Sequence, residues 1–167
     1  MNKKIIRYAL YGIEIMICFA LQVTPAALPE VFGGKAVLLL SLALSFGVFE
    51  KELPAMLLAV VCGFLTDCAY SGTVGFYVIM LVIACFTISL LFQEYFRKSM
   101  LTVMLTAFAA VPVILILQFL IFYVSAGYPD RWYMFFHHYF FRIVCTLMPI
   151  PVMYWVNGFV FRKTAET

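Results

Sequence analysis

Long runs of apolar residues, separated by short polar links, dominate this sequence and limit how it can fold. A helix needs about 20 apolar residues to cross a bilayer core, and the third run is expected to extend into its polar flanks. The runs cover residues 5–23, 36–49, 53–66, 75–92, 101–125 and 136–161. The sequence therefore predicts an all-α integral membrane protein, with residues 1–167 forming a single domain of six transmembrane helices.

Composition excludes a soluble globule. The chain is 66% hydrophobic and 11% charged, whereas soluble domains carry about 25% charged residues. The net charge of +3 predicts no nucleic-acid partner, because the basic residues lie in short groups beside the apolar runs. The first run follows Lys3, Lys4 and Arg7 and is long enough to span, so we expect a retained helix rather than a cleaved signal peptide.

The distribution of basic residues predicts the orientation. Six spans with a cytoplasmic N-terminus leave only Lys35 and Arg131 on the outer side, and Arg142 falls within the last span. Cytoplasmic loops are enriched in Lys and Arg, so both termini are expected to be cytoplasmic. The basic residues on the inner side are then those at 3, 4, 7, 51, 97, 98, 162 and 163.

The third run carries a face of small residues. Ala55, Ala59 and Gly63 recur every four positions, which places them along one side of a helix. Such faces let helices approach closely in lipid. The face is expected to serve either packing within the chain or the docking of a partner helix.

Asp67 follows this face, at the helix end where the dipole disfavours a carboxylate. We expect it to accept hydrogen bonds from backbone N–H groups of the turn at 71–75 and so to cap the next helix. Gly72 and Gly75 would supply unusual dihedral angles there. A partner contact, or proton or ion handling, are the alternatives for Asp67.

Three polar residues interrupt other runs. Glu14 lies near the middle of the first run, Gln118 in the fifth, and Arg142 about two turns into the sixth. Depths estimated from about 1.5 Å per residue bring Glu14 and Arg142 within reach of each other, and charged groups inside a bilayer face the bundle interior. We predict a buried polar cluster that holds helices in register, lines a ligand cavity or serves transport.

The sequence predicts no catalytic residues, no cofactor and no metal site. The five cysteines are scattered without a CxxC pair and are interpreted as packing residues with free thiols. His137 and His138 are adjacent, so on a helix they point about 100° apart and rarely chelate together. No nucleophile–base arrangement, phosphate-binding loop or HExxH pattern is present, so we expect no enzymatic activity.

Residues 33–86 resemble the rod shape-determining protein MreD family. The matching features are a Leu-rich helix after a Gly-bearing outer loop, a helix ending in Gly-x-x-x-Asp, and a Gly-x-x-Gly step that opens the next helix. They appear here as Gly34-Lys35-Ala36-Val37-Leu38-Leu39-Leu40, Gly63-Phe64-Leu65-Thr66-Asp67 and Gly72-Thr73-Val74-Gly75-Phe76-Tyr77.

The resemblance implies a multi-pass protein of the bacterial cytoplasmic (inner) membrane. It would be a scaffold or regulatory subunit of the cell-elongation machinery (the elongasome or rod complex) that binds MreC. Through MreC it would work with MreB, RodA and a penicillin-binding transpeptidase in peptidoglycan synthesis and cell shape. Membrane lipid and a second copy of the chain are further expected partners.

The family is similar in fold to the substrate-binding subunits of energy-coupling-factor vitamin transporters. The alternative function is therefore a vitamin-binding subunit of such a transporter. It would need an outer pocket with polar and aromatic groups, which Tyr70, Trp132, His138 and Arg142 could line.

Overall fold

The computed structural model describes residues 3–24, 35–70, 75–95, 99–124 and 135–165. All regular structure in these ranges is helical, which confirms the predicted fold class. The elements are α1 (Lys3–Val23), α2 (Leu38–Phe49), α3 (Glu52–Tyr70), α4 (Phe76–Glu94), α5 (Met100–Phe119), η1 (Leu120–Val124), η2 (Phe135–Tyr139), α7 (Phe140–Leu147) and α8 (Ile150–Ala165).

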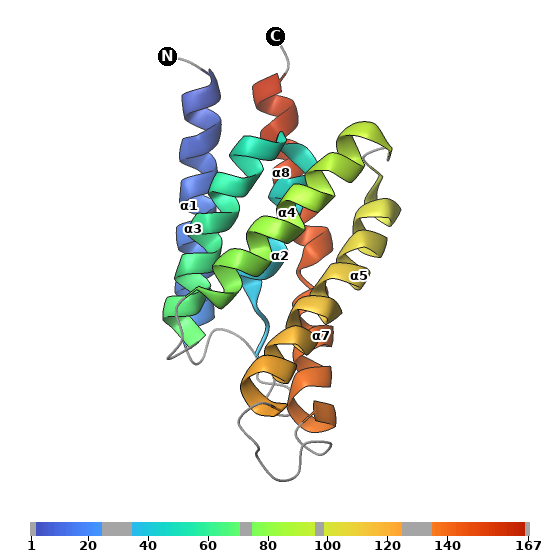
Figure 1. Ribbon diagram of the computed structural model, residues 1–167. Coiled ribbons are helices and arrows are strands. Elements are labelled where there is room, and N and C mark those ends of the chain that lie inside the picture. Colours follow the sequence, from blue (N-terminus) through green and yellow to red (C-terminus); the bar gives the residue numbers. More distant parts are fainter. Residues whose placement is uncertain (1–2, 25–34, 71–74, 96–98, 125–134, 166–167) are drawn as a thin grey trace.

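The helices pack as a bundle with both termini at the same end (Figure 1). We call this the terminal end and the opposite one the distal end. Within the described ranges, five helical segments are long and apolar enough to cross a membrane by length and composition. They are Ile5–Val23, Glu52–Tyr70, Phe76–Glu94, Met100–Phe122 and Phe140–Thr164.

The second predicted span is instead a short central helix. α2 has 12 residues, all of them buried, and is about 18 Å long, whereas the bilayer core is about 30 Å thick. It begins at Leu38, after an extended segment from Lys35 to Val37. α2 contacts α1, α3, α4, α5, α7 and α8. A helix that is apolar on every side is stable only when other elements surround it, so α2 forms the core of the bundle.

The backbone that leads into α2 is held by polar side chains from three other helices. Groups at membrane depth have no water to bind, so they must be satisfied within the protein. The bonds join the Val37 N–H to Thr146 Oγ1 (3.1 Å), the Leu39 N–H to Gln22 Oε1 (3.0 Å) and the Tyr70 hydroxyl to the Ala36 carbonyl (3.2 Å).

The sixth predicted helix, residues 136–161, is not continuous. The π-helical turn η2 leads into α7, and Met148 and Pro149 separate α7 from α8. Proline lacks the N–H that a helix needs and clashes with the carbonyl four residues earlier. Together α7 and α8 still form a segment of 25 residues that is long enough to span.

Candidate functional site

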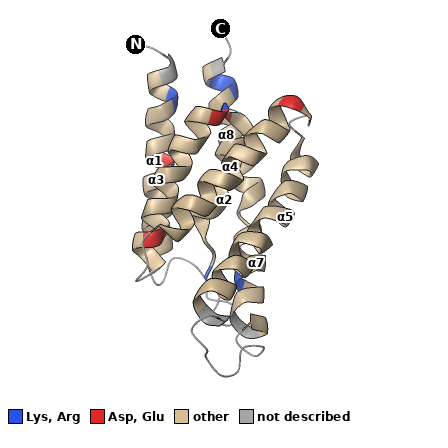
Figure 2. Cartoon of the chain, in the orientation of Figure 1, with Lys and Arg blue, Asp and Glu red and all other residues tan. Residues whose placement is uncertain are grey.

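Charged residues gather mainly at the terminal end, with fewer at the distal end (Figure 2). Polar contacts form a cluster near each end. We call Arg7, Tyr11 and Glu50 the terminal cluster, and Tyr70, Tyr77, Gln118 and Arg142 the distal cluster.

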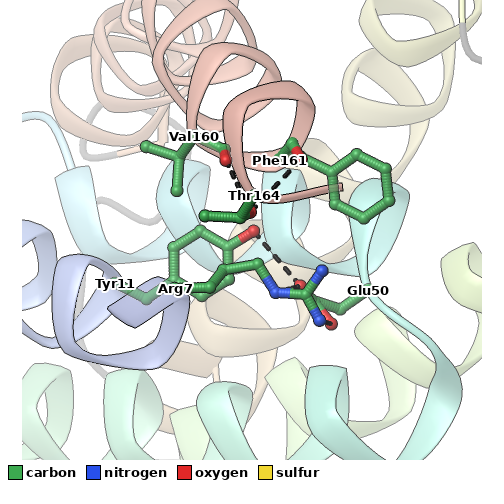
Figure 3. Close-up of polar contacts among 6 residues, drawn as sticks. All are labelled: Arg7, Tyr11, Glu50, Val160, Phe161 and Thr164. Atoms are coloured by element: carbon green, nitrogen blue, oxygen red, sulfur yellow. Dashed lines mark hydrogen bonds and ion pairs between the residues drawn. The ribbon is translucent and has the colours of Figure 1, made fainter. Parts of the chain in front are cut away.

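The terminal cluster is built around Glu50, which directly follows α2 and is only 4% exposed. Arg7 Nη2 donates to Glu50 Oε2 at 3.2 Å, and Arg7 Nε forms an ion pair with Oε1 at 3.0 Å. The Tyr11 hydroxyl also donates to Oε1, at 3.2 Å (Figure 3). Arg7 and Tyr11 are one turn apart on α1 and therefore share a face. The cluster ties α1 to the end of α2 with the buried charges matched.

An open cleft of about 600 Å³ lies beside the terminal cluster. Arg7 and Glu50 line it together with Lys51, Glu52 and Gln93. Basic and acidic side chains alternate there, so no single sign of charge dominates the cleft. Three charged residues in a row, Glu50, Lys51 and Glu52, are visible in the sequence, but the burial of Glu50 was not predicted.

The distal cluster is centred on Tyr77 in α4, which is 1% exposed. Its hydroxyl donates to Gln118 Oε1 at 2.6 Å and accepts from Arg142 Nη2 at 3.3 Å. The Arg142 guanidinium also lies over the Tyr70 ring, 4.7 Å from its centre, within the range of a cation–π interaction. Side chains from α3, α4, α5 and α7 thus meet at one point.

Two of the three residues in the predicted polar cluster come together here, and Glu14 does not. Gln118 and Arg142 both bind Tyr77, a residue that the prediction missed. Glu14 Oε1 is instead buried on α1 without a hydrogen-bond partner among the residues that the structure describes. The prediction compared only the depths of these residues in the bilayer. Depth does not tell which neighbouring helix a side chain faces.

The small-residue face of α3 packs within the chain. Ala55 and Ala59 are fully buried. A Cβ atom added to Gly63 would lie 2.5 Å from the Cα of Val78, so only glycine allows α4 to approach this closely. Of the two alternatives for this face, the structure shows packing within the chain, which at Gly63 is packing against α4.

Asp67 caps the N-terminus of α4. It is fully buried and accepts hydrogen bonds from the backbone N–H groups of Gly75 (2.8 Å), Tyr77 (3.1 Å) and Val78 (3.4 Å). A carboxylate is favourable at the positive end of a helix dipole. Gly75 has φ +115°, a conformation that L side chains rarely adopt. This is the predicted capping arrangement. Gly72 lies outside the described residues.

The side of α1 that faces away from Arg7, Tyr11 and Glu14 forms a shallow, open apolar surface, which the sequence analysis missed. A Cβ atom added to Gly12 would meet nothing within 4 Å. Ile13 and Met16 are 57% and 61% exposed. We call this surface the α1 groove. Its lining residues are Ala9, Gly12, Ile13, Met16, Ile17 and Ala20.

A signal for the α1 groove was present in the sequence. Arg7, Tyr11, Glu14, Cys18 and Gln22 follow helical spacing along one side of α1. Polar groups within a bilayer face the interior of the protein, so this side of α1 is the one that faces the bundle. The small and apolar residues between them are left facing outward.

Other predicted residues fall outside the described side chains, namely those of Trp132, His137 and His138. All five cysteines are free thiols. Among the residues that the structure describes, no group of three or more His, Cys, Asp or Glu side chains could hold a metal ion.

A family model described as rod shape-determining protein MreD matches residues 3–161, nearly the whole chain. The chain belongs to the MreD family. Membership supports a role in rod shape determination, and the apolar helices agree with a membrane protein. Comparisons with curated proteins and with solved structures find no match.

Proposed function

We propose that this MreD-family protein is a noncatalytic scaffold of the bacterial inner membrane that binds MreC and supports peptidoglycan synthesis. MreB, RodA and a penicillin-binding transpeptidase would be reached through MreC. The observation that carries the proposal is the α1 groove, an open small-residue surface on a protein whose family acts in rod shape determination.

The charge distribution supports an orientation with both termini in the cytoplasm. Arg7 lies near the start of α1, and Arg162 and Lys163 lie in the last turn of α8, so these residues belong to the terminal end (Figure 1). Lys51 lines the same cleft as Arg7. The positive-inside rule places this end in the cytoplasm. The distal end, with Asp67 and Arg142, would then face the outer leaflet.

The α1 groove is suited to the transmembrane helix of MreC. Lipid provides no hydrophobic drive for association between helices, so close packing against small residues must supply the affinity. The small face of α3 is used by α4, whereas Gly12 of α1 is open. Most of the apolar side chains on this side of α1 are also exposed, so a second helix could pack there without rearranging the bundle.

Substitution of Gly12 by leucine tests this assignment. A Cβ atom at this position meets no atom within 4 Å, so Tm should stay unchanged while MreC recovered by co-purification falls at least about tenfold, the equivalent of 1.4 kcal/mol. Ala109→Leu is the matched control, because Ala109 is an exposed small residue on α5. Equal recovery of MreC with both variants would remove the groove from the proposal.

The transporter alternative makes a different prediction for the purified protein. A vitamin-binding subunit should retain its ligand, which mass spectrometry of the native protein detects. A scaffold should retain MreC and no stoichiometric vitamin. Recovery of a vitamin at one per chain, without MreC, would overturn the scaffold proposal.

A further inference from the structure

Arg142 is a charged residue in a membrane-spanning segment whose contacts are with neutral groups. It is the third residue of the segment Phe140–Thr164. Its guanidinium binds the Tyr77 hydroxyl and lies over the Tyr70 ring, while its Nε is buried without a hydrogen-bond acceptor among the residues that the structure describes. Cations within spans are costly unless they are paired or reach the interface.

The fold gives Arg142 no carboxylate in the part of the chain that the structure describes. Arg7 and Glu50 form the ion pair found there. Asp67 lies on the same side of the bundle as Arg142, but its two oxygens accept backbone N–H groups of α4. Its charge is therefore already matched by the N-terminus of that helix.

The start of α2 also lies close to Arg142. The Thr146 hydroxyl donates to the Arg142 carbonyl at 2.7 Å and accepts from the Val37 N–H at 3.1 Å. This contact places Arg142 one turn of α7 from the start of α2, where the helix dipole is positive.

We propose that Arg142, with the Tyr70 ring beneath its guanidinium, binds the phosphate group of a membrane lipid. A guanidinium is a planar fork that matches phosphate geometry, and charge-assisted pairs of this kind are among the stronger hydrogen bonds. Arg142 lies near the end of a span, which is the depth of lipid headgroups. The Tyr77–Gln118 hydrogen bond orients the guanidinium from the buried side.

The test measures lipid retained by the full-length protein in native mass spectrometry, after exchange into detergent containing phosphatidylglycerol or diacylglycerol. The native protein should retain phosphatidylglycerol but not diacylglycerol, which lacks the phosphate. Arg142→Gln should lower the retained fraction at least about tenfold. Arg162→Gln, which removes an exposed cation at the terminal end, should leave it unchanged.

A second pair of variants keeps the test decisive if Arg142→Gln does not fold. Tyr70→Phe retains the ring under the guanidinium and should retain the lipid, whereas Tyr70→Leu removes the ring and should lower retention.

Three results would overturn the proposal. One is equal phosphatidylglycerol on the native protein and Arg142→Gln. A second is saturation of the site by inorganic phosphate alone, which would make the free ion the ligand. The third is loss of MreC from Arg142→Gln with unchanged lipid, which would assign Arg142 to a partner protein's acid.

Discussion

Arg7 and Arg142 are both partly buried arginines, yet the fold treats them differently. Arg7 meets the carboxylate of Glu50 at 3.0 Å, and Tyr11 donates to the same carboxylate. Arg142 meets a hydroxyl and an aromatic ring. A carboxylate enclosed by the protein must be matched inside the protein, whereas a guanidinium at headgroup depth can be matched by lipid. The terminal cluster therefore stabilises the fold, and the distal cluster is where we propose that a lipid phosphate binds.

The largest effect is expected when Arg7 is replaced by leucine. The Glu50 side chain, 3% exposed, would lose its cation, and removal of one partner from a buried pair costs about 3–5 kcal/mol. Thermal unfolding in detergent should show a large fall in Tm. Adding Glu50→Leu should restore most of it, because an apolar pair leaves no buried charge. If Arg7→Leu alone were as stable as the native protein, the buried Glu50 carboxylate would not need a cation.

A smaller loss is expected for Asp67→Ala, which frees the backbone N–H groups that Asp67 caps. Loss of an N-cap costs about 0.5–2 kcal/mol, measured as a fall in Tm. The double variant with Arg142→Gln sharpens the comparison. If Asp67 serves α4 alone, the two losses should add to within about 0.5 kcal/mol. Strong coupling would make Asp67 the counter-ion of Arg142, and the contrast with Arg7 would disappear.

The smallest effect on stability is expected for Arg142→Gln. It removes a 3.3 Å hydrogen bond to a neutral hydroxyl, worth about 0.5–1.5 kcal/mol, and leaves no unpaired carboxylate among the described residues. Tyr77→Phe should cost more, because Gln118 is buried and loses its donor. The Tm values of the two variants in detergent give the order directly. A loss for Arg142→Gln as large as that for Arg7→Leu would mean that Arg142 supports the fold as Arg7 does.

Features that depend on neighbouring residues could be predicted from the sequence. The apolar runs predicted the membrane class and the positions of the helices. Asp67 and Gly75 are eight residues apart, so a turn between two helices was enough to predict the cap. Their geometry follows from local chain properties, namely helix periodicity, the helix dipole and the conformational freedom of glycine.

Only the tertiary structure decided what each face of a helix meets. α2 looked like another span and proved to be the short core of the bundle. Gly63 of α3 packs against α4, whereas Gly12 of α1 lies on an open surface. Glu50 pairs with Arg7, 43 residues away in the sequence, and Arg142 donates a hydrogen bond to Tyr77, 65 residues away. A periodic pattern tells which residues share a side of a helix, but the angle at which that helix is turned in the bundle depends on how all the helices pack together.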